Sequence, residues 1–167
     1  LSGEIPSEIE LLQNLEKLFL LGNDLTGQIP ESIGNLINLT YLEFSDNNFI
    51  GQIPASIGNL SNLEELYAYN NSFSGSIPTT IGNLTNLNIL NLKENQLTGQ
   101  IPSSLGNLID LRYLFLNDNQ LEGELPYQIY NLTNLEFFWV QNNLLSGQIS
   151  EDICNFFGIT TNEGINL

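Results

Sequence analysis

The chain has 167 residues, 41% of them hydrophobic, which is enough for one domain with a sizeable core. Its 3 Lys and Arg against 19 Asp and Glu give a formal net charge of −16, which argues against nucleic acid and anionic lipid as partners. The absence of His and the single Cys exclude Ser–His and Cys–His catalysis, the common zinc frameworks and a disulfide within the chain.

Glycine recurs every 24 residues and marks a repeating unit. The glycines are Gly3, Gly27, Gly51, Gly75, Gly99, Gly123 and Gly147. Ile or Leu follows two residues later, and Pro comes next in every unit but the last. Six full units therefore cover residues 3–146, and an irregular seventh unit covers residues 147–167. We expect one domain, residues 1–167, truncated at both ends because it opens within a unit at Leu1.

Each unit contains three predicted elements in chain order. The proline removes a backbone donor and keeps the Gly-x-Ile-Pro segment extended. The Ile-Gly-Asn-Leu segment that follows has room for only a turn or two of helix. The stretches at residues 41–44 and 113–116 alternate inward and outward, which predicts short strands. Parallel strands lie about 4.8 Å apart, so seven coils span roughly 30 Å.

Apolar columns repeat as strictly as the glycines. They start at Ile9, Leu12, Leu15, Leu18, Leu20 and Leu25 and continue in steps of 24 residues. No single coil can bury so many apolar positions alone, whereas stacked coils turn each column into a continuous ladder. No run of about 18 apolar residues occurs, so no membrane span is predicted within the chain.

An asparagine column lies between the apolar columns. It consists of Asn23, Asn47, Asn71, Asn95, Asn119 and Asn143. We expect these amides to point inward and to bind backbone groups that are freed where the chain leaves each strand. The alternative is a set of surface turn asparagines.

The repeating pattern L-x-x-L-x-L-x-x-N-x-L-x-G-x-I-P, seen in "GSIPTTIGNLTNLNILNLKENQLT" at residues 75–98, resembles the plant-type leucine-rich repeat. Such repeats occur in ectodomains of plant receptor-like kinases, in polygalacturonase-inhibiting proteins and in some protist and bacterial surface proteins. The resemblance implies an α/β solenoid, a right-handed leucine-rich-repeat superhelix with a parallel β-sheet on the concave face and short 3₁₀ or helical turns on the convex side. It also implies an extracellular or cell-surface location.

The seventh unit departs from the pattern. Ile165 and Leu167 resemble the next strand pair displaced by about three residues, which indicates the approach to a C-terminal cap. Related caps often carry a disulfide, so Cys154 either pairs with a residue outside the chain or is a small buried residue. In the repeat it falls in the column of Gly34 and Gly58.

Five Asn-x-Ser/Thr sequences are possible N-glycosylation sites. They begin at Asn38, Asn59, Asn70, Asn83 and Asn131. The repeat consensus generates such sequences by itself, so their number is weak evidence for glycosylation.

The residues between the inward positions of each strand should form the candidate binding face. One aromatic and acidic group consists of Tyr41, Glu43, Glu65, Tyr67 and Tyr69, and a second group consists of Tyr113, Phe115, Phe137 and Trp139. Exposed apolar patches mark interaction sites, and Trp and Tyr are frequent anchors. The alternative is that aromatic residues merely suit β-strands.

Carboxylates also lie on or beside this face: Glu43, Asp46, Glu65, Glu94 and Asp118. Glycoside hydrolysis and calcium binding are conceivable for such acids, but no loop has EF-hand spacing, and we expect most of them to be solvated. The excess of acid either maintains solubility or binds basic partners. We therefore predict no enzyme activity, no cofactor and no metal site.

Two functions remain open from the sequence. The first is a non-catalytic recognition module that binds protein, peptide or glycan through the concave face. The second is a structural subunit of an extracellular assembly or filament, in which the chain associates with itself or with other chains.

Overall fold

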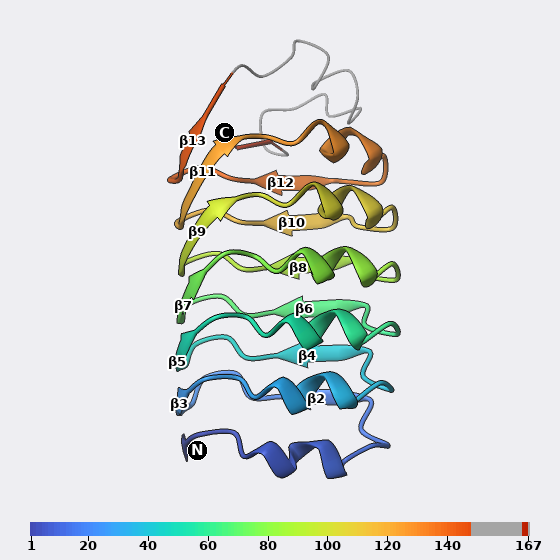
Figure 1. The fold of residues 1–167 in the computed structure, drawn as a ribbon, viewed down its shortest axis with the longest axis vertical. Helices are drawn as coiled ribbons and strands as arrows, with labels where there is room; N and C mark the ends of the chain where they lie inside the picture. Colours follow the sequence, from blue (N-terminus) through green and yellow to red (C-terminus); the bar gives the residue numbers. More distant parts are fainter. Residues whose placement is uncertain (148–164, 167) are drawn as a thin grey trace.

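The computed structural model describes residues 1–147 and the backbone of residues 165–166. Successive coils of the chain stack along one axis, each built from two short strands and one 3₁₀ helix (Figure 1). The predicted solenoid of leucine-rich repeats is confirmed, and its strands form two parallel sheets.

The first sheet is the predicted concave sheet. Its strands are β2 (Lys17–Phe19), β4 (Tyr41–Glu43), β6 (Glu65–Tyr67), β8 (Ile89–Asn91), β10 (Tyr113–Phe115), β12 (Phe137–Trp139) and β14 (Ile165–Asn166). From β2 to β12 each residue pairs with the residue 24 positions further on, as Tyr41 pairs with Glu65. Trp139 pairs with Asn166, which lies three positions beyond a 24-residue step. The predicted displacement of the last strand is thus confirmed at Ile165, whereas Leu167 lies outside the described residues.

The second sheet runs along the flank of the stack (Figure 1). Its strands are β1 (Ser2–Gly3), β3 (Asp24–Gly27), β5 (Asn48–Gly51), β7 (Ser72–Gly75), β9 (Gln96–Gln100), β11 (Gln120–Glu124) and β13 (Leu144–Ser146). The sequence predicted an extended segment here, and the structure adds hydrogen-bonded pairing between neighbouring coils. The repeated glycine turns the chain out of these strands with a positive φ, 78° at Gly51, which side chains with a Cβ rarely adopt.

The convex side consists of 3₁₀ helices. They are η1 (Ser7–Leu11), η2 (Glu31–Asn35), η3 (Ala55–Asn59), η4 (Thr79–Asn83), η5 (Ser103–Asn107) and η6 (Tyr127–Asn131). Each begins after the repeated proline, which is extended, as at Pro54 with φ −65°. Each ends where a Leu N–H donates to the carbonyl oxygen three residues earlier, as Leu60 does to Ile57. The prediction of a turn or two of helix after the proline is confirmed in the six full units.

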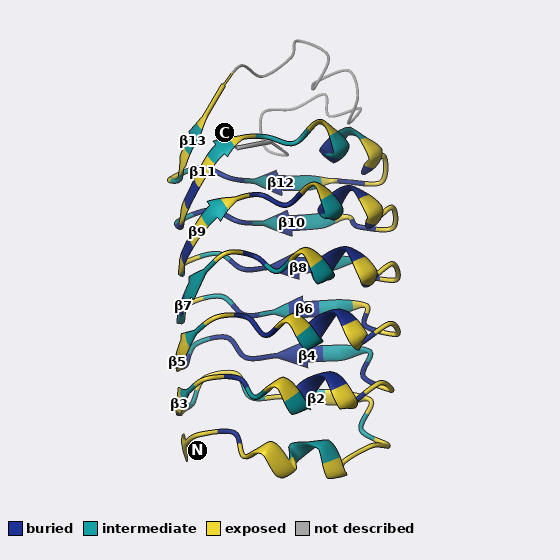
Figure 2. Cartoon of the chain, viewed as in Figure 1, coloured by how far each residue is buried: buried dark blue, intermediate teal, exposed yellow. Residues whose placement is uncertain are grey.

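The core is the stack of apolar ladders between the concave sheet and the convex helices. In the central coils the ladder residues are almost completely buried, as Figure 2 shows. The first coil has a neighbour on one side only, and its ladder is more open, so Leu12 is 50% exposed whereas Leu36 in the next coil is 0% exposed. Burial of each ladder therefore depends on the neighbouring coils.

The asparagine column points inward, as predicted, and joins adjacent coils. The side-chain Nδ2 of Asn95 donates to the carbonyl oxygens of Leu92 and Lys93 in its own coil, at 3.2 and 3.1 Å, and to that of Ala68 in the previous coil, at 2.9 Å. Its Oδ1 accepts from the backbone N–H of Phe73 at 3.0 Å. Asn47 and Asn119 repeat this arrangement. Backbone groups at the turn thus find partners that the strands do not provide.

A second glycine column brings the convex turns into close contact. A Cβ on Gly82 would lie 2.4 Å from the carbonyl oxygen of Ser104 in the next coil. Gly34, Gly58 and Gly106 meet the following coil at the same distance. Because the obstacle is backbone, a larger residue would have to move one coil away from the next.

We expect Asn95→Ala to lower the free energy of unfolding by about 1–3 kcal/mol, since it removes the partners of buried backbone groups. The exposed neighbour Gln96 is the control, because its side chain makes no hydrogen bond in the described structure, and Gln96→Ala should have little effect. Denaturant unfolding of both variants gives the comparison. Small and equal effects would contradict the structural role of the asparagine column.

We expect Gly82→Ala to cost about 1–3 kcal/mol of stability, because the added methyl group forces adjacent coils apart. Thermal and denaturant unfolding measure this effect. Thr79→Ala is a suitable control, since Thr79 is exposed at the start of the same helix η4. A stable Gly82→Ala variant would mean that the convex turns are not packed as tightly as the structure shows.

Candidate functional site

Both groups of candidate residues lie on the outer surface of the concave sheet, and pairing between strands decides which of them touch. Tyr41 and Glu43 lie on β4, and Glu65 and Tyr67 lie on the adjacent β6. Tyr41 pairs with Glu65 and Glu43 pairs with Tyr67, so that tyrosine and glutamate alternate at the corners of a square. We call these four residues the tyrosine–glutamate square.

The square is held together along each strand and across one diagonal. The Tyr41 hydroxyl donates to Glu43 Oε2 at 3.0 Å, and the Tyr67 hydroxyl donates to Glu65 Oε2 at 2.7 Å. The two tyrosine rings meet across the diagonal with their centroids 5.5 Å apart. Phe19 extends this aromatic surface, because its ring centroid lies 4.4 Å from that of Tyr41.

Glu43 is an exception to the expected solvation of the carboxylates. It is only 5% exposed, whereas the other four carboxylates are partly or fully exposed. Its Oε1 accepts a hydrogen bond from the backbone N–H of Ser45 at 3.2 Å, in addition to the bond from Tyr41. Glu43 lies beside Tyr67 on the adjacent strand, so its burial depends on the packing of side chains between coils.

The tyrosines of the square remain protonated far into the alkaline range. Burial, together with the hydrogen bond to Glu43, raises the pKa of Tyr41 to about 12. Burial and the hydrogen bond to Glu65 raise the pKa of Tyr67 as well. Ionisation would place a third negative charge beside two carboxylates, so the phenols act as neutral hydrogen-bond donors.

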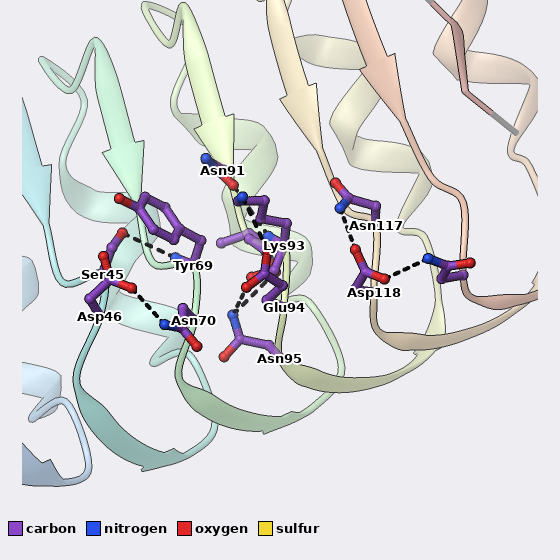
Figure 3. A network of polar contacts seen from close by, with 12 residues as sticks. Ser45, Asp46, Tyr69, Asn70, Asn91, Lys93, Glu94, Asn95, Asn117 and Asp118 are labelled. Carbon is purple, nitrogen blue, oxygen red and sulfur yellow. Dashed lines mark hydrogen bonds and ion pairs between the residues drawn. The ribbon is translucent and has the colours of Figure 1, made fainter.

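Tyr69 lies apart from the square, beside a row of polar turn residues (Figure 3). The Lys93 ammonium group lies 5.2 Å from the centre of the Tyr69 ring and 3.1 Å from Glu94 Oε1. Burial and the nearby Asp46 raise the pKa of Tyr69. The predicted group of five thus divides into the square and a Tyr69–Lys93 contact.

The turn carboxylates of this row have amide partners. Asn70 Nδ2 donates to Asp46 Oδ1, and Asn142 Nδ2 donates to Asp118 Oδ1, both at 2.6 Å. Asn117 Nδ2 also donates to Asp118, at 2.6 Å (Figure 3). Within the described residues no group of three or more acidic or cysteine side chains has an arrangement suited to a metal ion.

The second predicted group forms a continuous aromatic surface. We call its four residues the aromatic patch: Tyr113, Phe115, Phe137 and Trp139. Tyr113 stacks on Phe137 with centroids 5.4 Å apart, and Phe115 meets Trp139 edge to face at 5.0 Å. The rings belong to the adjacent strands β10 and β12, and all four remain partly exposed. The pairing supplies a rigid apolar surface with little side-chain entropy left to lose on binding.

An ion pair borders the aromatic patch, and it was not predicted. Arg112 binds Glu136 and also lies 5.6 Å from the centre of the Tyr113 ring. The Tyr113 hydroxyl donates to Glu136 Oε2 at 3.0 Å. Hydrogen bonds from Arg112 and Tyr113 lower the pKa of Glu136. The spacing of 24 residues between Arg112 and Glu136 is the sequence signal that could have revealed the pair.

Three polar atoms beside the aromatic patch lack a hydrogen-bond partner. They are Trp139 Nε1, Asn117 Oδ1 and Gln141 Oε1, and each atom is buried. Asn117 as a whole is only 4% exposed. Among the described residues Ser56 Oγ is the one further buried atom in this condition. Such groups cost free energy in a folded protein, and their concentration beside the patch marks it as a candidate site.

The five possible glycosylation asparagines are all exposed. Asn59, Asn83 and Asn131 are the last residues of the convex helices η3, η4 and η6. Asn38 and Asn70 donate hydrogen bonds to the carbonyl oxygen of Gln13 and to Asp46. The three convex sites thus leave the concave sheet uncovered. Cys154 lies outside the described residues.

No helix in the described part of the chain is long and apolar enough to cross a membrane. One groove borders the edge of the concave sheet where its strands begin, and its lining includes Thr40 and Glu64. A second groove lies on the proline-bearing side and is lined by Gln28, Gln52 and Pro54 among other residues. Neither is lined by aromatic side chains. The concave sheet is therefore the candidate binding face.

Comparison with known families and structures agrees with this architecture. The family model described as "Leucine-rich repeat region" matches residues 2–98, and the model "Leucine Rich Repeat" matches residues 110–132 and 134–156. No curated protein sequence shows significant similarity to the chain.

Several solved structures are similar over most of the chain. A plant peptide hormone receptor, RGFR1 in complex with RGF2, is 36% identical with a TM-score of 0.90, over 92% of this chain and 25% of the receptor chain. The ectodomain of the Arabidopsis receptor kinase HAESA, in complex with an IDA peptide hormone ligand, is 36% identical with a TM-score of 0.86. The match covers 89% of this chain and 25% of the HAESA chain. A plant ice-binding protein is 27% identical with a TM-score of 0.79, and the match covers 99% of this chain and 53% of the ice-binding protein.

The chain spans about a quarter of the length of the two receptor chains. The 24-residue unit, the two parallel sheets, the asparagine column and the matching family models agree with one another. The chain belongs to the leucine-rich-repeat family, and its 24-residue repeat is of the plant type.

Proposed function

We propose that the chain is part of a non-catalytic, extracellular recognition module that binds a peptide, or a peptide segment of a protein, through the concave sheet. The observation that carries this proposal is the aromatic patch, in which four rings from two strands form one partly exposed surface. The structures of RGFR1 with RGF2 and of HAESA with IDA support a peptide ligand.

Variation among the units supports a binding role for the patch. The column of Trp139 contains Phe19, Glu43, Tyr67, Asn91 and Phe115 in other units. Because Glu43 and Asn91 occupy it as well, the fold does not require an aromatic residue there. The adjacent inward column, which contains Leu114 and Phe138, is apolar throughout. An outward position that is free to vary, and is occupied by Trp beside three other rings, fits a contact residue.

Extracellular exposure is the part of the proposal that rests on the family. The similar ectodomains belong to plant membrane receptor kinases, and the exposed sequons on the convex side are compatible with a secretory route. Mass spectrometry of the chain isolated from its natural source would test this point, since glycans on Asn59, Asn83 or Asn131 require passage through the secretory pathway.

A random dodecapeptide library, displayed on phage and selected on the chain, provides a probe of the binding face. We expect Trp139→Ala to weaken binding of the selected synthetic peptides at least about tenfold, or roughly 1.4 kcal/mol. The expected loss of folding stability is smaller, about 1 kcal/mol, because the ring is partly exposed and packs on Phe115. Isothermal titration calorimetry and thermal unfolding measure the two effects.

Tyr127→Ala is the matched control, because Tyr127 is 76% exposed on the convex helix η6. It removes an aromatic side chain from the opposite side and should leave peptide affinity unchanged. Unchanged affinity of the Trp139→Ala variant would move the site elsewhere. A concentration-dependent mass that Trp139→Ala abolishes would assign the face to self-association instead.

A further inference from the structure

The two groups on the concave sheet differ in charge, and this difference defines the ligand further. We propose that the ligand is an extended peptide with an arginine side chain on the tyrosine–glutamate square and an apolar or aromatic side chain on the aromatic patch, about four residues apart. The inference rests on the proposed function and names the chemistry of the peptide that the same face selects.

The carboxylates of the square lack a positive partner within the described chain. The two ion pairs there join Lys93 to Glu94 and Arg112 to Glu136. Lys17, on the neighbouring strand β2, forms an ion pair with neither Glu43 nor Glu65. Phenol and amide donors satisfy the hydrogen bonding of Glu43, but they leave its charge uncompensated. A ligand cation would supply the missing charge.

The chain shows twice how it accommodates a cation on this side. Lys93 lies over the Tyr69 ring with Glu94 beside it, and Arg112 lies over the Tyr113 ring with Glu136 beside it. A tyrosine ring next to a carboxylate is the common element. The square repeats this element twice, at Tyr41 with Glu43 and at Tyr67 with Glu65, but has no cation of its own.

Arginine fits the square better than lysine. Its planar guanidinium group stacks on aromatic faces and binds carboxylate in a bidentate manner, whereas the ammonium group of lysine is a compact and strongly hydrated charge. Tyr41 already has ring neighbours on both adjacent strands, Phe19 and Tyr67, whereas the next neighbour of Tyr67, on β8, is Asn91. The Tyr67 ring, with Glu65 hydrogen-bonded to its hydroxyl, therefore provides such a face. The phenols stay protonated because burial raises their pKa values, so they can keep donating to the carboxylates while a guanidinium group is bound.

The aromatic patch takes the uncharged side chain. Its nearest carboxylate, Glu136, is already paired with Arg112. Bringing a second cation beside Arg112 would be unfavourable, since like charges at short range repel. The patch therefore selects an apolar or aromatic side chain, and the two subsites give the bound peptide one direction relative to the sheet.

The spacing of the two subsites follows from the sheet. The square lies on β4 and β6 and the patch on β10 and β12, so their centres are three strand spacings apart, or about 14 Å. An extended peptide advances about 3.3 Å per residue, so about four residues cover this distance. Between the subsites lies β8, whose outward residues, Ile89 and Asn91, are not aromatic.

The test begins with the sequences of the dodecapeptides that the chain selects. We expect an arginine and an apolar or aromatic residue four or five positions apart to be enriched together. Selected peptides without a cation, or with the two residues adjacent, would overturn the inference and leave the proposed function standing. If no peptide is enriched above the background on an uncoated surface, both this inference and the proposed function are contradicted.

A double-mutant cycle tests the contact itself. Replacing the arginine of a selected peptide by glutamine should weaken binding at least tenfold to the native chain, but less than threefold to the Glu65→Gln variant. Glu65→Gln keeps an acceptor for the Tyr67 hydroxyl, so the fold is preserved. Equal losses on both chains would show that the arginine binds elsewhere, which would overturn the inference.

Glu122→Gln is the charge-matched control, because Glu122 is exposed on β11 of the second sheet. In this variant, replacing the peptide arginine by glutamine should weaken binding as much as it does with the native chain. A reduced loss in this variant as well would mean that the peptide senses the overall negative charge rather than the square, and would also overturn the inference. Trp139→Ala should weaken binding of the arginine peptide and of its glutamine variant by the same factor.

Discussion

The architecture depends on one hydrogen-bonded group, the inward asparagine of each coil. Where the chain leaves a concave strand, its backbone carbonyl and amide groups lose their sheet partners inside an apolar interior. A single amide supplies them in two coils at once, as Asn95 does for Ala68, Leu92 and Phe73. An unpaired group at this depth would cost more than a typical hydrogen bond contributes. Because each asparagine binds both its own coil and the previous one, a change in the length of one coil would shift the position of the next.

The regular stacking has a direct consequence for the outer surface of the concave sheet. Since every coil from β2 to β12 is in the same register, outward residues 24 positions apart lie side by side on the sheet. The inward columns can hardly change, because each residue packs against its own equivalents. The outward columns are free to change, and differences between units decide the chemistry of the surface. The square arises because Tyr and Glu exchange places between β4 and β6.

The features of the fold that repeat in every unit could be predicted from the sequence, whereas side-chain contacts that occur only once could not. The solenoid, the concave strands, the helical turns and the inward asparagines follow from periodicity, because one pattern recurs in similar surroundings. The burial of Glu43 and the Arg112–Glu136 pair depend on how side chains of different coils pack, which the pattern of one unit does not contain. The grouping of Tyr69 with Lys93 rather than with Tyr41 has the same origin. Column positions predict neighbours, but side-chain conformations decide the contacts.

The negative charge of the chain connects the fold to recognition. A formal charge of −16 attracts positive ligands over long distances, and salt weakens this attraction. Such attraction accelerates encounter but does not discriminate between basic partners. Discrimination requires a place where the carboxylate is shielded from water, because screening is weaker there and the loss of hydration must be offset by a specific partner. Glu43, which is 5% exposed and accepts a hydrogen bond from Tyr41, is such a shielded carboxylate on the outward side of the sheet, and its negative charge adds to that of the partly exposed Glu65 beside it.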